Sequence, residues 1–268
     1  MKEHLETLLK KFVKYNSAEF ADKFLKLSED VYYDAVIISP GWTASKIFSK
    51  SEYSVQVVSQ HTYTSVQLIT MEEKKVAWIQ CVPGSCNVID YLGYCAGLNF
   101  GKLIFFGAAG GLTEEYTIGT VCTPSSCIAG SMAEAYLMEN PLDWKPFQEI
   151  FPNNPEWIDS VCELADFSVK KAKVFCTDSI FCEYNHLDFI TGFQTDLIEM
   201  ETSGFYRMAE LLEKPSIALL VVSDNSITGQ PLFGMSQEQL ADFNHSCQVL
   251  IPQIIERIVL QQKCNKVE

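Results

Sequence analysis

The sequence predicts an α/β fold with a mixed sheet, and three observations support this class. Residues 217–222 form an apolar run, which is typical of a strand covered on both faces. Before that run, apolar residues recur with the i, i+3, i+4, i+7 spacing of one buried helix face, at Phe205, Met208, Ala209 and Leu212. Two further strand patterns, 65–69 and 76–81, are joined by a short turn, so part of the sheet is expected to be antiparallel.

The other elements follow in chain order from the same kinds of pattern. We expect helices where apolar residues line one face of a segment, at 3–14, 17–27, 82–98, 132–138, 157–169 and 236–258. We expect strands in short apolar runs, at 35–38, 53–58, 102–106 and 173–176. A glycine-rich loop is expected at 107–112, and a loop at 229–235 could close over a ligand. Ser236 and Gln239 fit a capping box for the last helix, and Pro252 should kink that helix.

Length and composition indicate one globular domain. The 268 residues contain no run rich in proline, glycine or serine, so we expect a single domain over 1–268, with residues 1–30 as an N-terminal helical extension. Hydrophobic residues make up 47% and charged residues 20% of the chain, which is enough for a sizeable core. The net charge of −14 argues against nucleic acid as a partner, because phosphate backbones are bound by lysine and arginine.

Ten cysteines are scattered through the chain without a CxxC pair. A zinc site needs closely spaced ligands, so no metal site is expected. We expect reduced thiols and hence a cytoplasmic protein. The charged N-terminus has no apolar core of signal-peptide length, and no run approaches the ~18 apolar residues of a membrane span. A membrane is therefore not expected as a partner.

Acidic residues on either side of the predicted 205–212 helix are candidates for the functional site. Asp224 follows the buried strand, and in open α/β sheets ligands bind outside the carboxyl ends of the strands. Burial there would raise the pKa of Asp224, so that it could act as a general acid near neutral pH. Glu199 and Glu201 precede the helix, and two interpretations remain open for them: carboxylates favoured by the helix dipole, or groups that bind a ligand.

The order Glu199-Met200-Glu201, helix, apolar strand and Ser223-Asp224 resembles the nucleoside phosphorylase/nucleosidase superfamily, and so do residues 106–112 and Ser39-Pro40-Gly41. That family includes purine nucleoside phosphorylase, uridine phosphorylase and methylthioadenosine/S-adenosylhomocysteine nucleosidase. The resemblance covers roughly residues 34–258. It implies a three-layer α/β/α sandwich around a mixed, partly barrel-like sheet, and a homo-oligomer that is a dimer, trimer or hexamer.

The resemblance also implies roles for individual residues in the binding of a small-molecule nucleoside. Asp224 would protonate a purine at N7 as the base leaves, and Glu201 would accept hydrogen bonds from the ribose hydroxyls. Met200 would pack under the sugar, and Glu199 matches the family's first carboxylate. Phe181 matches a phenylalanine that stacks on the base, although an aromatic residue after a strand can equally belong to the core.

Small residues in the glycine-rich segment and polar residues after the buried strand complete the expected nucleoside site. Ala108, Ala109 and Gly110 would let the main chain pass close to the sugar or base. Ser223 and Asn225 flank the candidate catalytic acid and are expected to contact the substrate.

Inorganic phosphate is the candidate co-substrate, and no other cofactor is expected. In the family a Pro-Gly turn binds phosphate through its glycine amide, and Gly41 matches that glycine. The family's phosphate-binding arginines are missing, since Ser45 and Lys46 stand beyond the turn and a phenylalanine precedes the glycine-rich segment. Lys46 and His61 are the remaining candidates for binding phosphate, although a lone histidine is more often a surface or packing residue.

The predicted function is cleavage of the N-glycosidic bond of a purine nucleoside by phosphorolysis, which gives free base and ribose 1-phosphate, as in purine salvage. Three alternatives remain. The missing arginines favour hydrolysis, as in the nucleosidases, but the glutamate of those enzymes is absent from the turn at Ser39-Pro40-Gly41. The incomplete nucleophile site also fits a nucleoside-binding or sensing protein without turnover. The third alternative is an unrelated α/β enzyme.

Overall fold

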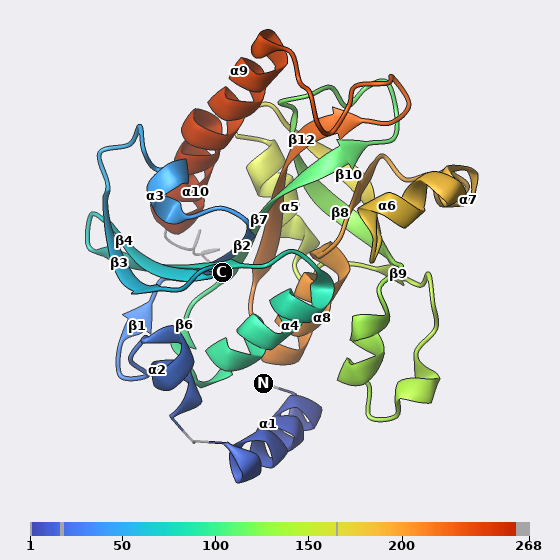
Figure 1. The fold of residues 1–268 in the computed structure, drawn as a ribbon. Coiled ribbons are helices and arrows are strands. Elements are labelled where there is room, and N and C mark those ends of the chain that lie inside the picture. The colour runs from blue at the N-terminus through green and yellow to red at the C-terminus, as the bar shows by residue number, and fades with distance from the viewer. Residues whose placement is uncertain (1, 17–18, 165, 261–268) are drawn as a thin grey trace, which may run out of the picture.

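A ten-stranded mixed sheet lies at the centre of the computed structural model (Figure 1). The structure describes residues 2–16, 19–164 and 166–260. In this described chain the sheet consists of β2 (Ala35–Pro40), β3 (Ser54–Gln60), β4 (Ser65–Met71), β5 (Lys74–Cys81), β7 (Leu103–Gly111), β8 (Val121–Ala129), β9 (Glu149–Ile150), β10 (Val169–Cys176), β11 (Leu197–Glu199) and β12 (Ser216–Asn225). A separate parallel pair joins β1 (Tyr32–Tyr33) and β6 (Asn99–Phe100).

Five of these strands close into a barrel. Their order is β11-β10-β8-β12-β7, and β11 also pairs with β7, so that the last strand meets the first. The closing pair is antiparallel and places Leu197 opposite Gly111 and Ile198 opposite Gly110. Beyond the barrel, β2 lies between β7 and β5 and is parallel to both. β5 then pairs antiparallel with β4, and β4 pairs antiparallel with β3. The prediction of a mixed, partly barrel-like sheet is therefore confirmed.

Helices cover both faces of the sheet, which confirms the predicted three layers (Figure 1). They are α1 (Glu3–Tyr15), α2 (Phe20–Leu25), α3 (Ala44–Ile47), α4 (Ser85–Tyr94), α5 (Pro155–Cys162), α6 (Ile180–Glu183), α7 (Leu187–Thr191), α8 (Thr202–Leu212), α9 (Gln237–His245) and α10 (Ile251–Leu260). Short 3₁₀ helices occur at Cys95–Gly97, Met132–Leu137, Pro141–Asp143 and Tyr184–His186. One core cluster joins α1, α2, α4 and α8 to the sheet, and a second joins α3, α5, α9 and α10 to its other face.

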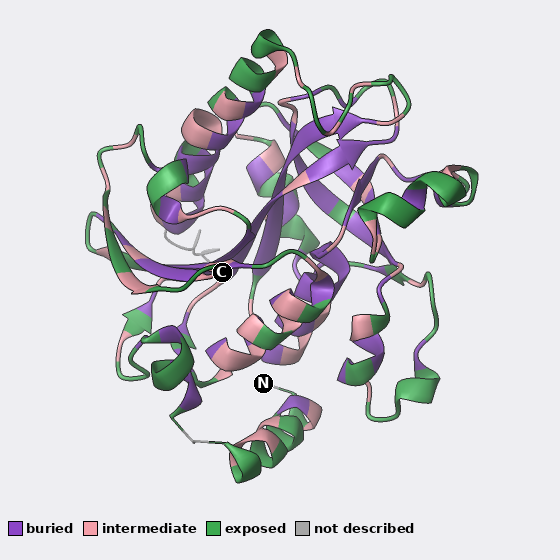
Figure 2. Cartoon of the chain, viewed as in Figure 1, coloured by how far each residue is buried: buried purple, intermediate pink, exposed green. Residues whose placement is uncertain are grey.

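The alternation of side chains along β12 divides these two clusters. Ala218, Leu220 and Val222 pack in the first cluster, and the residues between them pack in the second. The whole strand is buried, and its neighbours β7 and β8 are buried at all but one position each (Figure 2). A strand with apolar cover on both faces is an uninterrupted apolar run in the sequence, which explains why 217–222 shows no polar alternation.

Most of the predicted elements are present. The helix expected at 3–14 is α1, and Ser236 with Gln239 forms the predicted capping box at the start of α9. The helix expected at 17–27 corresponds to α2, whereas Ser17 and Ala18 lie outside the described residues. The nine cysteines in the described chain are free thiols, and Cys264 lies outside it. Over the same residues, none of the helices combines the length and the apolar character that crossing a membrane requires.

Two local predictions are wrong, and a third is not tested. Residues 107–111 are not a loop but the end of β7, because they pair with β12 and β11. The helix expected at 157–169 ends at Cys162, and β10 already begins at Val169. The kink expected at Pro252 stays a prediction; a π-helical turn at Ser246–Leu250 precedes this proline, and α10 continues through it. That turn changes the hydrogen-bond register just before proline, which has no amide proton to donate.

The junction of β7, β11 and β12 depends on the glycine at position 111. A Cβ atom there would lie 2.4 Å from Asn225 Nδ2 and 2.7 Å from the carbonyl oxygen of Tyr116. We expect Gly111→Ala to lower the free energy of unfolding by about 1–3 kcal/mol, the usual range for overpacking, in a denaturant titration. Gly93→Ala on α4 is the control and should not destabilise, because no atom lies within 4 Å of its Cβ position. Equal effects of the two substitutions would contradict this account.

Candidate active site

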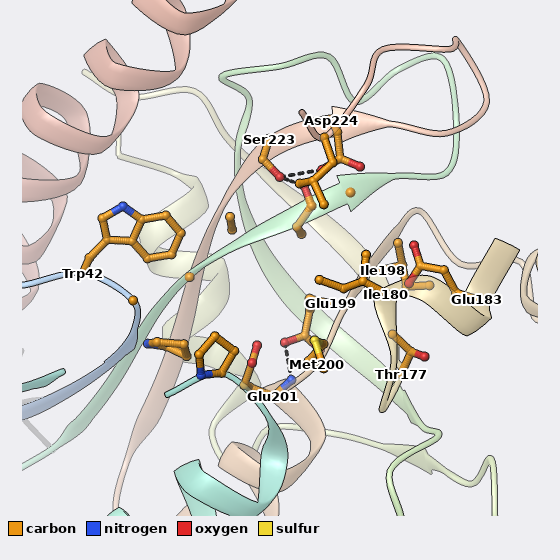
Figure 3. A pocket seen from close by; sticks show the side chains of 18 residues that line it. Trp42, Thr177, Ile180, Glu183, Ile198, Glu199, Met200, Glu201, Ser223 and Asp224 are labelled. Carbon is orange, nitrogen blue, oxygen red and sulfur yellow. Dashed lines mark hydrogen bonds between the residues drawn. The ribbon is translucent and has the colours of Figure 1, made fainter. Parts of the chain in front are cut away.

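A cavity opens at the ends of β2, β7, β11 and β12 (Figure 3). The carboxyl ends of strands are the usual ligand sites of open α/β sheets. Nine of the predicted site residues line this cavity: Gly41, Ala108, Ala109, Gly110, Glu199, Met200, Glu201, Ser223 and Asp224. The fold therefore brings together residues that come from the first long strand, the middle and the last strand of the chain.

A β-bulge at the end of β12 positions Ser223 and Asp224. The pairing of β12 with β7 shifts register between Val222 and Asp224, which leaves Ser223 as the extra residue. Bulges redirect side chains, and here both Ser223 and Asp224 line the cavity. Ser223 Oγ donates to Asp224 Oδ1 at 2.6 Å and also lies 3.3 Å from the carbonyl oxygen of Ala109.

Burial shifts the pKa of Asp224 in the direction that the sequence analysis expected. The residue is buried at the end of the strand, and this burial raises the pKa of Asp224 above its ordinary value. The hydrogen bond from Ser223 stabilises the carboxylate and offsets part of the rise. Asp224 therefore holds a proton to a higher pH than an exposed aspartate does, as a general acid requires.

Glu199 is buried at the start of α8 and holds the turn in place. Its Oε2 accepts hydrogen bonds from the backbone amides of Glu201 at 2.7 Å and Thr202 at 2.8 Å. Its Oε1 accepts from Cys176 Sγ at 2.7 Å. Two free amides at a helix N-terminus favour a carboxylate. The helix-terminus interpretation therefore holds for Glu199.

Glu201 presents its carboxyl group to the cavity on the side opposite Asp224 (Figure 3). Its Oε1 accepts a hydrogen bond from the amide of Gly84 at 2.6 Å. Gly84 has φ 111°, a conformation that glycine adopts without strain. Burial, together with the nearby charge of Glu199, raises the pKa of Glu201 to about 8. Glu199 thus serves mainly to position the turn, and Glu201 is the glutamate available to a ligand.

Glu183 on α6 completes the acidic wall and was missed by the sequence analysis. It is 7% exposed and lines the cavity with Thr177 and Ile180. Burial and the charge of Asp224 raise the pKa of Glu183 to about 7. No motif marks this residue, because the position of a four-residue helix depends on contacts made elsewhere in the fold.

Trp42, Pro83 and Leu232 also line the cavity and were not predicted as site residues. Trp42 directly follows Gly41, so its position beside the Pro-Gly turn could have identified it as a site residue from the sequence. Leu232 lies in the 229–235 segment, which the sequence analysis expected near a ligand.

Two predicted contact residues, Asn225 and Phe181, lie outside the cavity wall. The side-chain amide of Asn225 donates to the carbonyl oxygens of Thr113 at 2.8 Å and Tyr116 at 2.9 Å, so it anchors the loop that precedes β8. Phe181 is 86% exposed, and its neighbour Ile180 faces the cavity instead.

The predicted phosphate residues are not gathered in one place. Lys46 on α3 and His61 after β3 are exposed, and neither lines the cavity. Gly41 does line it, but its amide donates to the carbonyl oxygen of Cys81 at 3.0 Å.

The cavity is acidic. Within the part of the chain that the structure describes, its wall contains four carboxyl groups and no lysine, arginine or histidine; the four are Glu183, Glu199, Glu201 and Asp224. The described residues also contain no group of side chains spaced to hold a metal ion.

Comparison with known proteins identifies the family. Residues 47–258 match the family model of the phosphorylase superfamily, and the chain belongs to that superfamily. The sequence is 24% identical over 156 residues to a DeoD-type purine nucleoside phosphorylase of Exiguobacterium sp., a match that covers 58% of this chain and 64% of the relative. It is 26% identical to the corresponding protein of Brevibacillus brevis, over 56% of this chain and 62% of the relative. The chain thus spans less than two thirds of the length of these curated relatives.

Solved structures show the same fold. A uridine phosphorylase from Vibrio fischeri has a TM-score of 0.72 at 11% identity, covering 88% of this chain and 95% of that one. A 5′-methylthioadenosine/S-adenosyl homocysteine nucleosidase from Campylobacter jejuni has a TM-score of 0.64 at 14% identity, covering 84% and 98%. The resemblance seen in the sequence is confirmed, because the chain belongs to the phosphorylase superfamily and these structures share its fold.

The raised pKa of Glu201 makes stability depend on pH. The folded protein keeps this carboxyl protonated up to about pH 8, whereas the unfolded chain releases the proton near 4.5. Stability is therefore full below about pH 4.5 and falls as the pH rises toward 8, by up to about 1.4 kcal/mol per pH unit for one proton. We expect the melting temperature to fall between pH 5.5 and 8, and Glu201→Gln to reduce that fall.

The matched control is Glu238→Gln, which changes an exposed carboxylate on α9. It should leave the slope of melting temperature against pH as it is in the wild type. If Glu201→Gln and the control gave the same slope as the wild type, Glu201 would not be the titrating group.

Proposed function

We propose that this protein cleaves the N-glycosidic bond of a purine nucleoside. The observation that carries the proposal is the position of Asp224 and Glu201 on opposite sides of one cavity, each buried and each with a raised pKa. The bond breaks with positive charge at C1′ of the sugar and negative charge on the base. A catalyst therefore needs an acid at the base and acceptors at the sugar hydroxyls.

Asp224 is the group that we assign to the base. As the C1′–N9 bond breaks, its electron pair moves into the purine, and Asp224 donates its proton to N7. The hydrogen bond from Ser223 then supports the carboxylate that remains. A positioned general acid contributes about 10²–10⁴-fold to the rate. We assign Glu201 to the ribose hydroxyls and Met200, which lies beside it in the wall, to the underside of the sugar.

The atom that replaces the base at C1′ comes from water or from phosphate. Among the described residues the acidic wall contains no lysine, arginine or histidine. This favours water, since proteins bind phosphate through arginine, lysine and amide groups. Water would give free ribose, by hydrolysis. Phosphorolysis is the second candidate, favoured by the DeoD-type relatives and by the Pro-Gly turn at Gly41. It would give ribose 1-phosphate.

We also propose a homo-oligomer in the cytoplasm that works in purine salvage. Large apolar side chains are exposed on the described surface, among them Tyr136, Leu142 and Phe233, and contacts between subunits would remove such side chains from water. A neighbouring subunit could then add groups to the mouth of the cavity, including a cation.

Loss of the proposed acid should abolish base release. We expect Asp224→Ala to lower kcat for adenosine or inosine by about 10²–10⁴-fold, measured as free base by chromatography. Asp188→Ala is the control, because Asp188 is exposed on α7 and lies outside the cavity wall. If the wild type bound nucleosides but released no base, the protein would be a nucleoside-binding protein instead.

Phosphate dependence separates the two candidate reactions. We expect base release from dialysed enzyme to continue without phosphate, with ribose as the second product. The reason is that the described residues of the cavity wall include no basic side chain to bind the phosphate dianion. Sulfate at equal ionic strength is the control for salt effects. Release that requires phosphate and yields ribose 1-phosphate would establish phosphorolysis and refute the hydrolytic assignment.

A further inference from the structure

A second pocket lies beside the candidate active site and shares two wall residues with it, Thr177 and Glu183. Its remaining wall is largely aromatic, with Phe147, Phe175 and Phe189 as the main contributors. The ring centroids of Phe147 and Phe189 are 5.0 Å apart in an edge-to-face arrangement, and those of Phe147 and Phe175 are 6.0 Å apart in a stacked one. The pocket is therefore an ordered aromatic surface that adjoins the cavity.

The backbone holds Phe147 in this wall in an unfavourable conformation. Its φ is 60°, and its amide donates to the carbonyl oxygen of Ala129 at 2.8 Å. A bulky residue rarely adopts the left-handed region, and such strain persists mainly at ligand sites. Phe147 is also 37% exposed, so burial in the core does not explain its position.

Glu183 separates the two pockets and has an unfilled hydrogen-bonding capacity. The residue is 7% exposed, and no hydrogen bond to its carboxyl group occurs among the described residues. Because Glu183 lines both pockets, its carboxyl oxygens remain open to a ligand there. A ligand with an N–H group at this boundary would satisfy Glu183.

The proposed binding of the base supplies such a group. In a purine, N7 and the exocyclic group at C6 share one edge. With N7 at Asp224, the 6-substituent lies along the same edge and extends beside that acid. Glu183 is the neighbouring carboxyl group in the wall, close enough for the charge of Asp224 to raise its pKa. A substituent that continues past Glu183 enters the aromatic pocket.

We propose that the aromatic pocket binds an apolar substituent on the exocyclic 6-nitrogen of a purine nucleoside, with Glu183 accepting the hydrogen bond of that N–H. This inference rests on the proposed function, because it uses the orientation of the base at Asp224. The class of substrate is an N6-alkyl or N6-aryl adenosine. The apolar group packs on Phe147 and Phe189 in the edge-to-face and stacked geometries that aromatic rings favour.

The test compares adenosine with N6-benzyladenosine as substrates of the full chain. We expect kcat/KM for the benzyl compound to exceed that for adenosine by about tenfold or more, since a buried ring removes a large apolar area from water. Phe189→Ala should bring the ratio of the two kcat/KM values close to one. Tyr184→Ala is the matched control: Tyr184 is an exposed aromatic residue between Glu183 and His186 that lines neither pocket, so the ratio should stay as in the wild type.

Binding measurements keep this inference separate from the proposed function. Calorimetry of N6-benzyladenine and adenine should show the same preference in the wild type and its loss in Phe189→Ala. Adenosine cleavage without any preference for the benzyl compound would overturn the inference and leave the proposed function intact. Absence of cleavage with both nucleosides would remove the proposed function, and equal affinities for the two bases would then remove the inference as well.

Discussion

The antiparallel pairing of β11 with β7 is the constraint on which the rest of the structure depends. It closes the barrel and places Glu199 at the end of β11 close to the last residues of β7. The contact requires small residues, because a Cβ at Gly110 would lie 3.0 Å from Asp224 Oδ2 and 3.2 Å from Ile198. The glycine-rich segment is thus part of the barrel wall. Because its glycines have no side chains, they leave space for the cavity.

Burial of acidic groups next to each other is the second consequence of this architecture. All four carboxyl groups have raised pKa values because they are buried. Glu199 accepts hydrogen bonds from two amides and a thiol, whereas Glu183, Glu201 and Asp224 are available to a ligand in the cavity. Carboxyl groups with raised pKa values hold protons to a higher pH than exposed ones, and they can donate these protons or accept hydrogen bonds as the ligand requires. Burying these carboxyl groups costs folding stability, and this cost falls at the place where a neutral, hydroxyl-rich ligand with N–H donors would fit.

The sequence was sufficient to predict the fold and the two acidic residues at opposite sides of the cavity. Asp224 and Glu201 flank a helix and strand whose apolar patterns are local, so their positions followed from the pattern. Glu183 could not be found this way, because α6 has only four residues and so no apolar periodicity that would mark it in the sequence. The same short helix exposes Phe181 and turns Ile180 inward, a rotation that no local pattern sets. The role of Asn225 also depends on the loop at Thr113, far away in the chain.

The charge of the cavity wall bears on whether a ligand can carry a phosphate group. A nucleoside 5′-monophosphate would carry a dianion to a wall where the described residues offer carboxyl groups and no cation. Under the proposed function, nucleotides should therefore be excluded, although they share base and sugar with nucleosides. The substrate would then reach this site only after its phosphate has been removed.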